Sequence, residues 1–350
     1  VREDAHATLA FFREQEVGLR VISGDDPTTV AAIAGKVDLL GQGRAVTGSD
    51  ARTLPHDREE LATALEQASV LGRVTPEQKV GIVEALQSRG HTVAMTGDGV
   101  NDALAIKTAD LGIAMGNGAR ATKAVSRIVL LDGKFSTLPG VLAQGRRVIA
   151  NMERVANFFL VKTAYSTVLA LVTIIAGFVF PIAYPFLPRQ LTLVSSLTIG
   201  IPGFLLSLPS SSERYVPGFL RRVLSFALPA GVVVAVAALL VTSIASDPDV
   251  AGVRMARTLA TFSTLGLGLV IVVLHARPLA WWKLVMVGCL LAAGLIAPYV
   301  PLASDFFLLE QPDPKHWLLV SVVVAIGGAL LVGIWALARR RGVTERAKIS

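Results

Sequence analysis

Cysteine is nearly missing from this sequence, and charged and aromatic residues are scarce. Cys289 is the single cysteine in 350 residues, and it lies in an apolar run. One cysteine excludes an intramolecular disulfide framework and suits a reducing compartment. Only 17% of the residues are charged, whereas 53% are hydrophobic, and the mean hydropathy is +0.59. Soluble domains rarely reach such values, so the composition predicts a chain with a soluble part and a membrane part.

Acidic residues are absent from six apolar stretches in the second part of the chain. Each stretch approaches the ~20 residues that a helix needs to cross ~30 Å of hydrocarbon. Six such runs favour a transmembrane domain, residues 155–338, over one or two long buried core helices. The stretches are residues 155–180, 190–208, 223–245, 258–276, 281–300 and 316–338.

Basic residues near the ends of these stretches indicate the orientation. The net charge of +7 does not predict a nucleic-acid partner, because the Lys and Arg residues collect at the stretch ends. Arg154, Arg222 and the basic tail, residues 339–350, fall on one side of the membrane, and fewer basic residues fall on the other. The basic side is normally cytoplasmic. We therefore expect a multi-pass protein in the lipid bilayer of the plasma membrane, with its N-terminal part and its C-terminus in the cytoplasm.

The first part of the chain alternates apolar, strand-like runs with helical patterns. Continuous apolar strands between helices predict a parallel sheet that is covered on both faces. We expect an α/β Rossmann-like domain over residues 1–134 and a connecting helix over residues 135–154 that continues into the first membrane helix. The strand-like runs are residues 19–23, 70–74, 92–96, 111–115 and 127–131.

Two acidic, glycine-containing turns follow strands of this sheet, where ligands of such sheets bind. The second, Thr96–Asp102, reads Thr-Gly-Asp-Gly-Val-Asn-Asp. Asp98 comes just after the strand and Asp102 starts the next helix, so their carboxylates can meet at one point. Hard oxygen ligands with room for water suit Mg²⁺, which takes one or two carboxylates together with phosphate oxygens. The turn therefore predicts a magnesium site formed by Asp98 and Asp102.

Other residues fit a phosphate site at the same edge of the sheet. Ser23 of the turn Ser23-Gly24-Asp25 offers a hydroxyl and backbone N–H groups to a phosphate oxygen, and Asn101 adds a polar group at a helix N-terminus. Lys79 opens a helix and can neutralise a phosphoryl group. A single Lys on a helix is usually solvated, and Ser-Gly-Asp is usually only a turn. The prediction therefore depends on Thr96–Asp102.

These motifs resemble those of a known family. Thr96–Asp102, followed by Ala-Asp-Leu-Gly-Ile-Ala-Met-Gly at residues 109–116, is similar to the hinge signature of P-type cation-transporting ATPases, which belong to the haloacid-dehalogenase-like (HAD-like) superfamily. Val21–Asp25 resembles the second phosphate-binding motif of the family, and Lys79 falls on its lysine. Residues 207–222 resemble the actinobacterial CtpE branch. The resemblance implies a HAD-like phosphorylation domain followed by an all-α domain of six membrane helices.

The resemblance also implies a reaction, in which ATP and Mg²⁺ are the cofactors. Asp98 and Asp102 would bind Mg²⁺, Asn101 would support the phosphorylated site, and Lys79 would stabilise the transferred phosphoryl group. Ser23, Gly24 and Asp25 would contact phosphate. The reaction forms and hydrolyses an aspartyl phosphate, and catalysis depends on positioning and charge neutralisation. The implied activity is ATP hydrolysis coupled to cation translocation.

One part of the family's machinery is not in this sequence. The family's nucleophile lies in Asp-Lys-Thr-Gly-Thr, and this string does not occur in the chain, which opens with Val1. We therefore expect a C-terminal fragment that is inactive alone and that acts with the missing N-terminal portion of the same polypeptide. In the superfamily the nucleophile's strand lies between the strands that end at Ser23 and Thr96. The sheet should therefore have a gap there.

The membrane helices differ from those of the better-known calcium and sodium pumps, because Ile199 stands where an Asp often does. Lys162 is either a cation built into the ion path or a lysine that reaches the membrane surface. Pro202 should break its helix and free backbone carbonyls. Ca²⁺ is the first choice of transported cation, from resemblance to the branch, with Mg²⁺, Mn²⁺, K⁺ and H⁺ still open. The candidate ion-path residues are Lys162, Thr163, Ser166, Thr198 and Pro202.

Two other functions are compatible with these residues. A membrane-anchored phosphatase of the same superfamily would share the magnesium motif and transport nothing. A non-catalytic truncated membrane protein would act through partners. Asp-Lys-Thr-Gly-Thr in the missing portion would favour the pump, and Asp-x-Asp would favour the phosphatase, which needs a second acid/base carboxylate.

Overall fold

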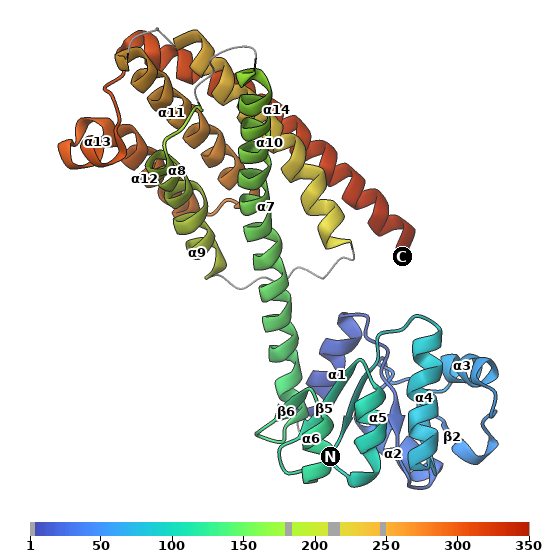
Figure 1. Ribbon diagram of the computed structural model, residues 1–350. Helices are drawn as coiled ribbons and strands as arrows, with labels where there is room; N and C mark the ends of the chain where they lie inside the picture. Colours follow the sequence, from blue (N-terminus) through green and yellow to red (C-terminus); the bar gives the residue numbers. More distant parts are fainter. Residues whose placement is uncertain (1–3, 179–183, 209–217, 246–249, 350) are drawn as a thin grey trace. The chain divides into compact units, whose positions relative to one another are not determined.

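The computed structural model describes residues 4–178, 184–208, 218–245 and 250–349 (Figure 1). The chain divides into two compact units, Val1–Leu142 and Ala143–Ser350, called unit 1 and unit 2 below. Each unit has a hydrophobic core of its own. The two units are described separately.

Unit 1 is an α/β unit in which all strand pairs are parallel, as predicted. The five strands expected from apolar runs are present, and a further strand, β2, consists of Gly-Ser-Asp and has no apolar signal. The strands are β1 (Val21–Ile22), β2 (Gly48–Asp50), β3 (Val70–Gly72), β4 (Ala94–Gly97), β5 (Leu111–Met115) and β6 (Ile128–Leu130). The helices are α1 (Ala5–Glu14), α2 (Pro27–Lys36), α3 (Arg58–Gln67), α4 (Pro76–Ser88), α5 (Ala103–Thr108) and α6 (Arg120–Val125), with 3₁₀ turns η1 (Ala51–Thr53), η2 (Val100–Asp102) and η3 (Phe135–Thr137).

Helices cover both faces of β3, as the continuous apolar strands predict. Val70 packs in a cluster with residues of α2, whereas Leu71 packs with residues of α3 and α4. Successive strand residues point to opposite faces, so α2 lies on one face and the α3–α4 pair on the other. Val70 and Leu71 are both fully buried. The helices of unit 1 therefore bury β3 on both faces, and the polar turns lie at the strand ends.

The expected gap in the sheet is confirmed. The strands form two three-stranded sheets, ordered β1-β3-β2 and β4-β5-β6. Among the described residues, β1 has β3 as its single strand neighbour and β4 has only β5. Ile22 of β1 nevertheless packs in the cluster that contains Met95 of β4. The open edges of β1 and β4 therefore belong to neighbouring parts of one unit.

Unit 2 is helical, and among the described residues of the chain six helical segments are long and apolar enough to cross a membrane, which agrees with the number predicted. These candidate spans are Phe135–Gly177, Pro188–Ser207, Phe219–Ala245, Gly252–His275, Trp281–Tyr299 and Pro314–Arg339. The elements are α7 (Leu138–Gly177), α8 (Pro188–Ser195), the π-helical η4 (Ser196–Gly200), α9 (Ile201–Ser207), α10 (Phe219–Ala245), α11 (Val250–His275), α12 (Trp281–Ile296), η5 (Ala297–Tyr299), α13 (Pro301–Phe307) and α14 (Pro314–Ile349).

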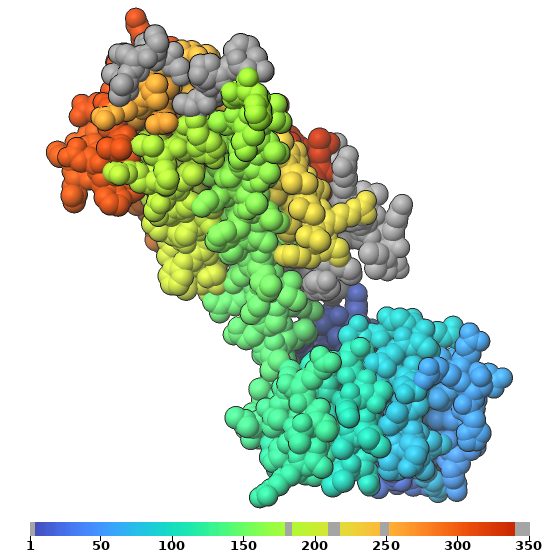
Figure 2. Space-filling model, in the orientation of Figure 1, coloured from blue at the N-terminus to red at the C-terminus, as the bar shows by residue number. Residues whose placement is uncertain are grey.

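The first membrane helix, α7, runs unbroken from Leu138 to Gly177. Pro139 is its second residue, a position where the missing N–H has no partner to lose. Figures 1 and 2 show α7 beside the segment formed by α8, η4 and α9. Side chains of α7 bond to the last carbonyls of that segment: Asn151 Nδ2 lies 3.0 Å from the oxygen of Ser207. These bonds satisfy carbonyls that a helix end leaves without donors.

Pro202 does not break the second membrane helix as expected. The chain remains helical from Pro188 to Ser207, and a π-helical segment precedes the proline. There the N–H of Ile201 bonds to the carbonyl of Ser196, five residues earlier. The wider turn accommodates a proline, which has no N–H and would clash with a regular α-helical turn. The change in the backbone is therefore a π-bulge at residues 196–200.

The fourth span is the centre of unit 2. In its most apolar window 72% of the residues are buried, compared with 22% in the first span. Its hydroxyl-bearing residues lie inside the bundle, in contrast to the exposed apolar residues of the outer helices. The buried hydroxyl residues are Thr258, Thr261, Ser263 and Thr264. The centre of unit 2 is therefore more polar than its surroundings.

Candidate functional site

The structure brings together two of the predicted catalytic side chains, Lys79 and Asp102. Lys79 lies in the first turn of α4, whose start is fixed by Pro76 and by a capping box between Thr75 and Gln78. Lys79 Nζ is 2.6 Å from Asp102 Oδ1. The two side chains are only 12% and 13% exposed. Partial shielding from water strengthens this charge-assisted bond.

Asp102 is held against the end of strand β4. Its Oδ2 accepts the N–H of Gly99 at 3.3 Å, while Oδ1 accepts from Lys79. A Cβ at Gly97 would lie 2.6 Å from Asp102 Oδ2. Only glycine at position 97 therefore lets the carboxylate come so close to the strand end. The glycine in the Thr-Gly-Asp-Gly sequence thus has a steric role.

Asp98 follows β4 directly, and its backbone is fixed by the loop after β5. The Asp98 carbonyl accepts the N–H of Ala119 at 2.8 Å, and a Cβ at Gly118 would lie 2.8 Å from that carbonyl oxygen. Asp98 and Asn101 are exposed, whereas Asp102 is half-buried. The loop thus presents one solvent-facing carboxylate, one amide and one shielded carboxylate.

The donor set fits magnesium better than a metal that needs a closed protein cage. In the described part of the chain, no three His, Cys, Asp or Glu side chains gather into one group. Mg²⁺ is usually held by one or two carboxylates and completes its shell with water and phosphate oxygens. Asp98 and Asp102 could supply that number of ligands.

The Ser23–Asp25 turn is held by its own side chains and by the segment after β3. Ser23 Oγ donates to Asp25 Oδ2 at 3.0 Å and accepts the N–H of Asp25 at 3.2 Å. The backbone of Arg73 bonds to the Asp25 carbonyl at 2.8 Å, and that of Val74 to the Ser23 carbonyl at 3.0 Å. The turn is therefore ordered, and its contacts are with its own atoms and with residues 71–74.

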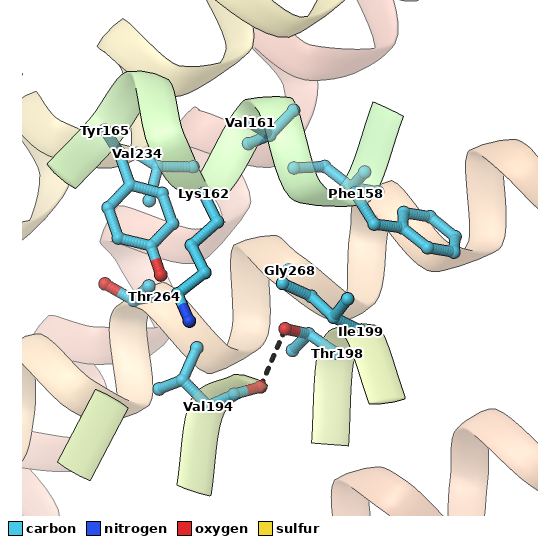
Figure 3. A pocket seen from close by; sticks show the side chains of 11 residues that line it. Phe158, Val161, Lys162, Tyr165, Val194, Thr198, Ile199, Val234, Thr264 and Gly268 are labelled. Carbon is cyan, nitrogen blue, oxygen red and sulfur yellow. Dashed lines mark hydrogen bonds between the residues drawn. The ribbon is translucent and has the colours of Figure 1, made fainter. Parts of the chain in front are cut away.

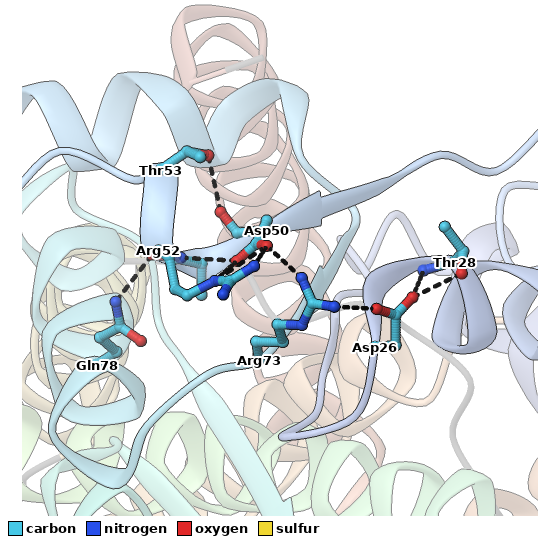
Figure 4. A network of polar contacts seen from close by, with 8 residues as sticks. Asp26, Thr28, Asp50, Arg52, Thr53, Arg73 and Gln78 are labelled. Atoms are coloured by element: carbon cyan, nitrogen blue, oxygen red, sulfur yellow. Dashed lines mark hydrogen bonds and ion pairs between the residues drawn. The ribbon is translucent and has the colours of Figure 1, made fainter.

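An ionic network that the sequence analysis missed ties the ends of three strands together (Figure 4). Arg73, which follows β3 with φ of 56°, donates to Asp50 Oδ2 at 2.8 Å and also pairs with Asp26. Hydrogen bonds from Arg52 hold the pKa of Asp50 below its usual range, and bonds from Thr28 lower the pKa of Asp26. Arg73 lies near the C-terminal end of the predicted strand-like run 70–74, and this position was the one available signal.

Unit 2 contains a cavity between α7, η4 and α11 (Figure 3). Of the predicted ion-path residues, Lys162 and Thr198 line it, whereas Ser166 and Pro202 are not among its lining residues. Thr163 is exposed and bonds to the carbonyl of Phe159 at 3.0 Å on its own helix. The cavity is lined by Phe158, Val161, Lys162, Tyr165, Val194, Thr198, Ile199, Val234, Thr264, Gly268 and Ile271.

The lining residues that were not predicted include Thr264 and Gly268 of α11. A Cβ at Gly268 would lie 2.6 Å from Thr198 Cγ2, so glycine lets α11 pack directly against η4. Thr264 is 2% exposed. The repeated hydroxyl residues in an otherwise apolar stretch of α11 could have indicated this wall of the cavity.

Comparison with known proteins identifies the family. Residues 1–110 match the family model for haloacid dehalogenase-like hydrolases. The chain is 45% identical over 359 residues to "Calcium-transporting ATPase CtpE" of Mycolicibacterium smegmatis, in an alignment that covers 99% of this chain and 44% of the relative. The chain is a member of the P-type cation-transporting ATPase family. The predicted resemblance, including the CtpE branch, is thereby confirmed.

Two more distant members of the family give the same result. "Probable cation-transporting ATPase exp7" of Streptococcus pneumoniae is 34% identical, over 93% of this chain and 42% of the relative. "Calcium-transporting ATPase" of Bacillus subtilis is 30% identical, over 95% of this chain and 39% of the relative. The chain therefore spans less than half the length of the curated relatives that it matches. It corresponds to their C-terminal part.

The family and the fold agree along the whole chain. The HAD-like match covers β1 to α5 and includes Ser23, Lys79, Asp98 and Asp102. The six apolar helical segments follow it, so this P-type ATPase chain is a membrane protein with an α/β part. HAD-like P-type ATPases typically use Mg²⁺ and ATP. The roles of individual residues are taken up below.

Proposed function

We propose that this chain is the C-terminal part of an ATP-driven cation pump that works through an aspartyl phosphate. The observation that carries the proposal is the shielded contact between Lys79 and Asp102 at the end of β4, in a unit where β1 and β4 each present an open edge. A cation and a carboxylate fixed at a strand end suit phosphoryl transfer, where catalysis consists mainly of positioning and charge neutralisation. The phosphorylated Asp would come from a segment outside these 350 residues.

In this proposal each catalytic residue has a separate role. Asp98 and Asp102 hold Mg²⁺, which neutralises charge on phosphate oxygens when it is bound. Lys79 holds Asp102 in place and presents a positive charge to the phosphoryl group. Ser23, Gly24 and Asp25 contact phosphate, for which the Ser23 hydroxyl must turn away from Asp25. Asn101 supports the phosphorylated site from η2.

The open edges of β1 and β4 would receive the strand that carries the phosphorylated Asp. An open parallel edge presents unpaired N–H and C=O groups that favour the addition of a strand. A strand inserted there would end beside both Ser23 and Gly97, since parallel strands end at the same side of a sheet. This arrangement would bring the nucleophile to the Mg²⁺ ligands.

The transported cation is proposed to be Ca²⁺, and unit 1 and the C-terminus are proposed to lie on the cytoplasmic side of the plasma membrane. Support for Ca²⁺ comes from the names of the relatives in Mycolicibacterium smegmatis and Bacillus subtilis. Support for the orientation comes from the basic residues near the helix ends. Continuous α7 would transmit movement towards the ion path, in which Lys162, Thr163, Ser166, Thr198 and Pro202 were the candidates.

The test is phosphorylation of the complete gene product by ATP. We expect an acid-stable phosphoenzyme that depends on Mg²⁺ and Ca²⁺ and is lost in Asp98→Asn. Cation-independent hydrolysis of small phosphate esters, with no phosphoenzyme formed from ATP, would instead indicate the membrane-anchored phosphatase. Absence of both reactions, with vanadate-sensitive ATPase activity also absent, would indicate a non-catalytic membrane protein.

A further inference from the structure

Two arginines of unit 2 meet at one tryptophan near the ends of three candidate spans. Arg277 lies in the turn between α11 and α12, and Arg339 is the last residue of the sixth candidate span. Each guanidinium carbon lies over the Trp335 ring, 4.7 Å from the ring centre. The two carbons are therefore no farther apart than twice this distance. Arg277, Arg339 and Trp335 are called the Trp335 cluster below.

The positive charge of the Trp335 cluster is not balanced by nearby carboxylates. Neither guanidinium group has a hydrogen bond or an ion pair within the part of the chain that the structure describes. The sequence contains no Asp or Glu in residues 250–304 or 314–344. Each guanidinium has five N–H donors, which contact with a ring face leaves free. Two like charges at this separation repel each other, so an anion beside them would be stabilising.

Lys283 fixes the backbone on both sides of Arg277. Its Nζ donates to the carbonyl of Ala276 at 2.6 Å and to that of Pro278 at 2.8 Å. These bonds hold the turn between α11 and α12 and place a third positive charge beside it. Arg277 therefore extends from an ordered backbone, which lowers the entropy lost when its side chain binds a ligand.

The residues around the Trp335 cluster are apolar and exposed. Leu279, Trp281 and Leu337 are 42%, 77% and 60% exposed, and they lie in the same turn, at the start of α12 and near the end of the sixth span. Tryptophan is common where the hydrocarbon of a membrane meets the lipid headgroups. A ligand that fits this surface therefore combines a negative charge with an apolar part.

We propose that the Trp335 cluster binds the headgroup phosphate of an anionic phospholipid, whose acyl chains lie against the exposed apolar residues. The planar guanidinium group suits phosphate because it can donate two parallel hydrogen bonds. Basic sites between the ends of membrane helices bind anionic headgroups in this way. A phosphatidylcholine headgroup would add a further positive charge, so the cluster should select a lipid with net negative charge. The proposal goes beyond the pump, because it requires neither ATP nor a transported ion.

The experiment measures lipid binding by the complete gene product in mild detergent. Phosphatidylglycerol or phosphatidylcholine with identical acyl chains is added, and native mass spectrometry gives the dissociation constant of each. We expect the wild type to bind phosphatidylglycerol more tightly. Arg277→Gln and Arg339→Gln should each weaken phosphatidylglycerol binding about fivefold, the contribution of one arginine near an anionic lipid surface. A wild type that binds the two lipids equally overturns the proposal without any variant.

Two further variants separate a site from diffuse attraction. Arg221→Gln removes an exposed charge at the same end of the bundle, because the Phe226 ring near the start of α10 lies 4.8 Å from the ring of His275 at the end of α11. It should leave phosphatidylglycerol binding unchanged. Arg277→Lys keeps the charge without the planar fork and should retain only part of the affinity. Equal losses in Arg221→Gln and Arg277→Gln would overturn the proposal.

Inorganic phosphate distinguishes a lipid site from a site for a soluble anion. It should not displace phosphatidylglycerol from the wild type, because it cannot use the apolar surface; displacement at equal concentration would overturn the lipid assignment. Thermal unfolding in phosphatidylcholine nanodiscs shows whether the variants are folded, and Arg277→Gln and Arg339→Gln should unfold there at the wild-type midpoint. Added phosphatidylglycerol should raise the midpoint of the wild type more than that of either variant, and an equal rise in all three would contradict the proposal.

Discussion

Polar side chains find their partners differently in the two units. In unit 1 the charged groups at the strand ends pair with one another: Lys79 with Asp102, and Arg73 with Asp26 and Asp50. In unit 2 the cavity hydroxyl of Thr198 donates to the carbonyl of Val194 at 2.7 Å on its own helical segment, and that of Thr264 has no partner among the described residues. The comparison shows the effect of the solvent. Water solvates the many charged groups at a strand end, whereas hydrocarbon favours neutral polar groups whose hydrogen bonds the helices can supply.

The largest effect should come from the charged pair in unit 1. Asp102→Asn in the complete gene product should lower phosphoenzyme formation by about 10²–10³-fold, because it would remove a proposed Mg²⁺ ligand and leave the Lys79 charge without its carboxylate partner. Rapid-quench measurement of phosphorylation by ATP checks it. Glu66→Gln, on the exposed face of α3, is the control and should have no effect. Similar rates for the two variants would contradict the proposed site.

Replacing a closely packed glycine by alanine should destabilise unit 1 more than unit 2. A Cβ at Gly72 would lie 2.5 Å from backbone atoms of Pro27, so Gly72→Ala should destabilise unit 1 by about 3 kcal/mol. A Cβ at Gly268 would meet the Thr198 side chain instead, which can shift, so Gly268→Ala should cost about 1 kcal/mol. Hydrogen exchange of peptides that cover β3 and α11 measures both.

Two glycines provide matched controls for that experiment. Gly81 in α4 has only Leu61 Cδ2 within 4 Å of a Cβ position, at 3.9 Å, and Gly288 in α12 has no described heavy atom within 4 Å. Replacing either by Ala should be neutral or stabilising, since Ala favours helices by about 0.5–1 kcal/mol. A larger loss at Gly268 than at Gly72 would reverse the comparison.

Lowering the pH should reduce the stability of unit 1 before that of unit 2. The pKa values of Asp26 and Asp50 are lowered in the folded state, by hydrogen bonds from Thr28 and Arg52. Their contribution to stability is therefore present above the unfolded-state pKa of about 3.9 and is lost as pH falls through the lower folded-state pKa. Unit 2 should respond less, because its six apolar stretches contain no Asp or Glu.

The measurement is urea unfolding at pH 2 to 6, with the state of each unit read by pulsed hydrogen exchange at one fixed pH. Asp50→Asn should flatten the acid dependence of peptides that cover β1 to β3. The same acid dependence in wild type and Asp50→Asn would show that this network does not control the stability of unit 1.

The smallest effect is expected for a surface ion pair of unit 2. Arg254 Nη1 lies 3.9 Å from Glu310 Oε1, and the side chains are 53% and 41% exposed. Such pairs contribute little, so Arg254→Gln should change the free energy of unfolding by less than about 0.5 kcal/mol. Thermal unfolding in nanodiscs with Gln substituted at the exposed Arg277 as a reference checks this. A change above about 1 kcal/mol would show an unrecognised role for the pair.

The sequence predicted secondary structure best where a short residue pattern is typical of a single type of element. Five of the strands were found from apolar runs, whereas β2 was missed because Gly-Ser-Asp has no strand signal and pairs only through β3. Lys79 and Asp102 were expected at the same edge of the sheet, yet their direct contact and the network around Arg73 were not. A surface Arg and two Asp residues far apart in the chain give no pattern until the strand order is known.

The position of a residue along a predicted membrane helix did not reveal whether its side chain faces the cavity. Lys162 and Thr163 are adjacent in sequence, but Lys162 faces the cavity and Thr163 is exposed, because successive residues on a helix point about 100° apart. The same reasoning could not find Thr264, since its importance depends on which helix α7 packs against. Pro202 was expected to break a helix that instead widened into a π-bulge.

The sequence by itself determined the membrane segments, the parallel strands and the Thr-Gly-Asp-Gly-Val-Asn-Asp loop, because apolar periodicity and local backbone chemistry are properties of neighbouring residues. Only the tertiary structure decided which edges of the sheet stay open, which carboxylate Lys79 contacts and which hydroxyls meet at the cavity. These features join residues that are distant in the chain. They follow from the packing of strands and helices, which no short sequence pattern contains.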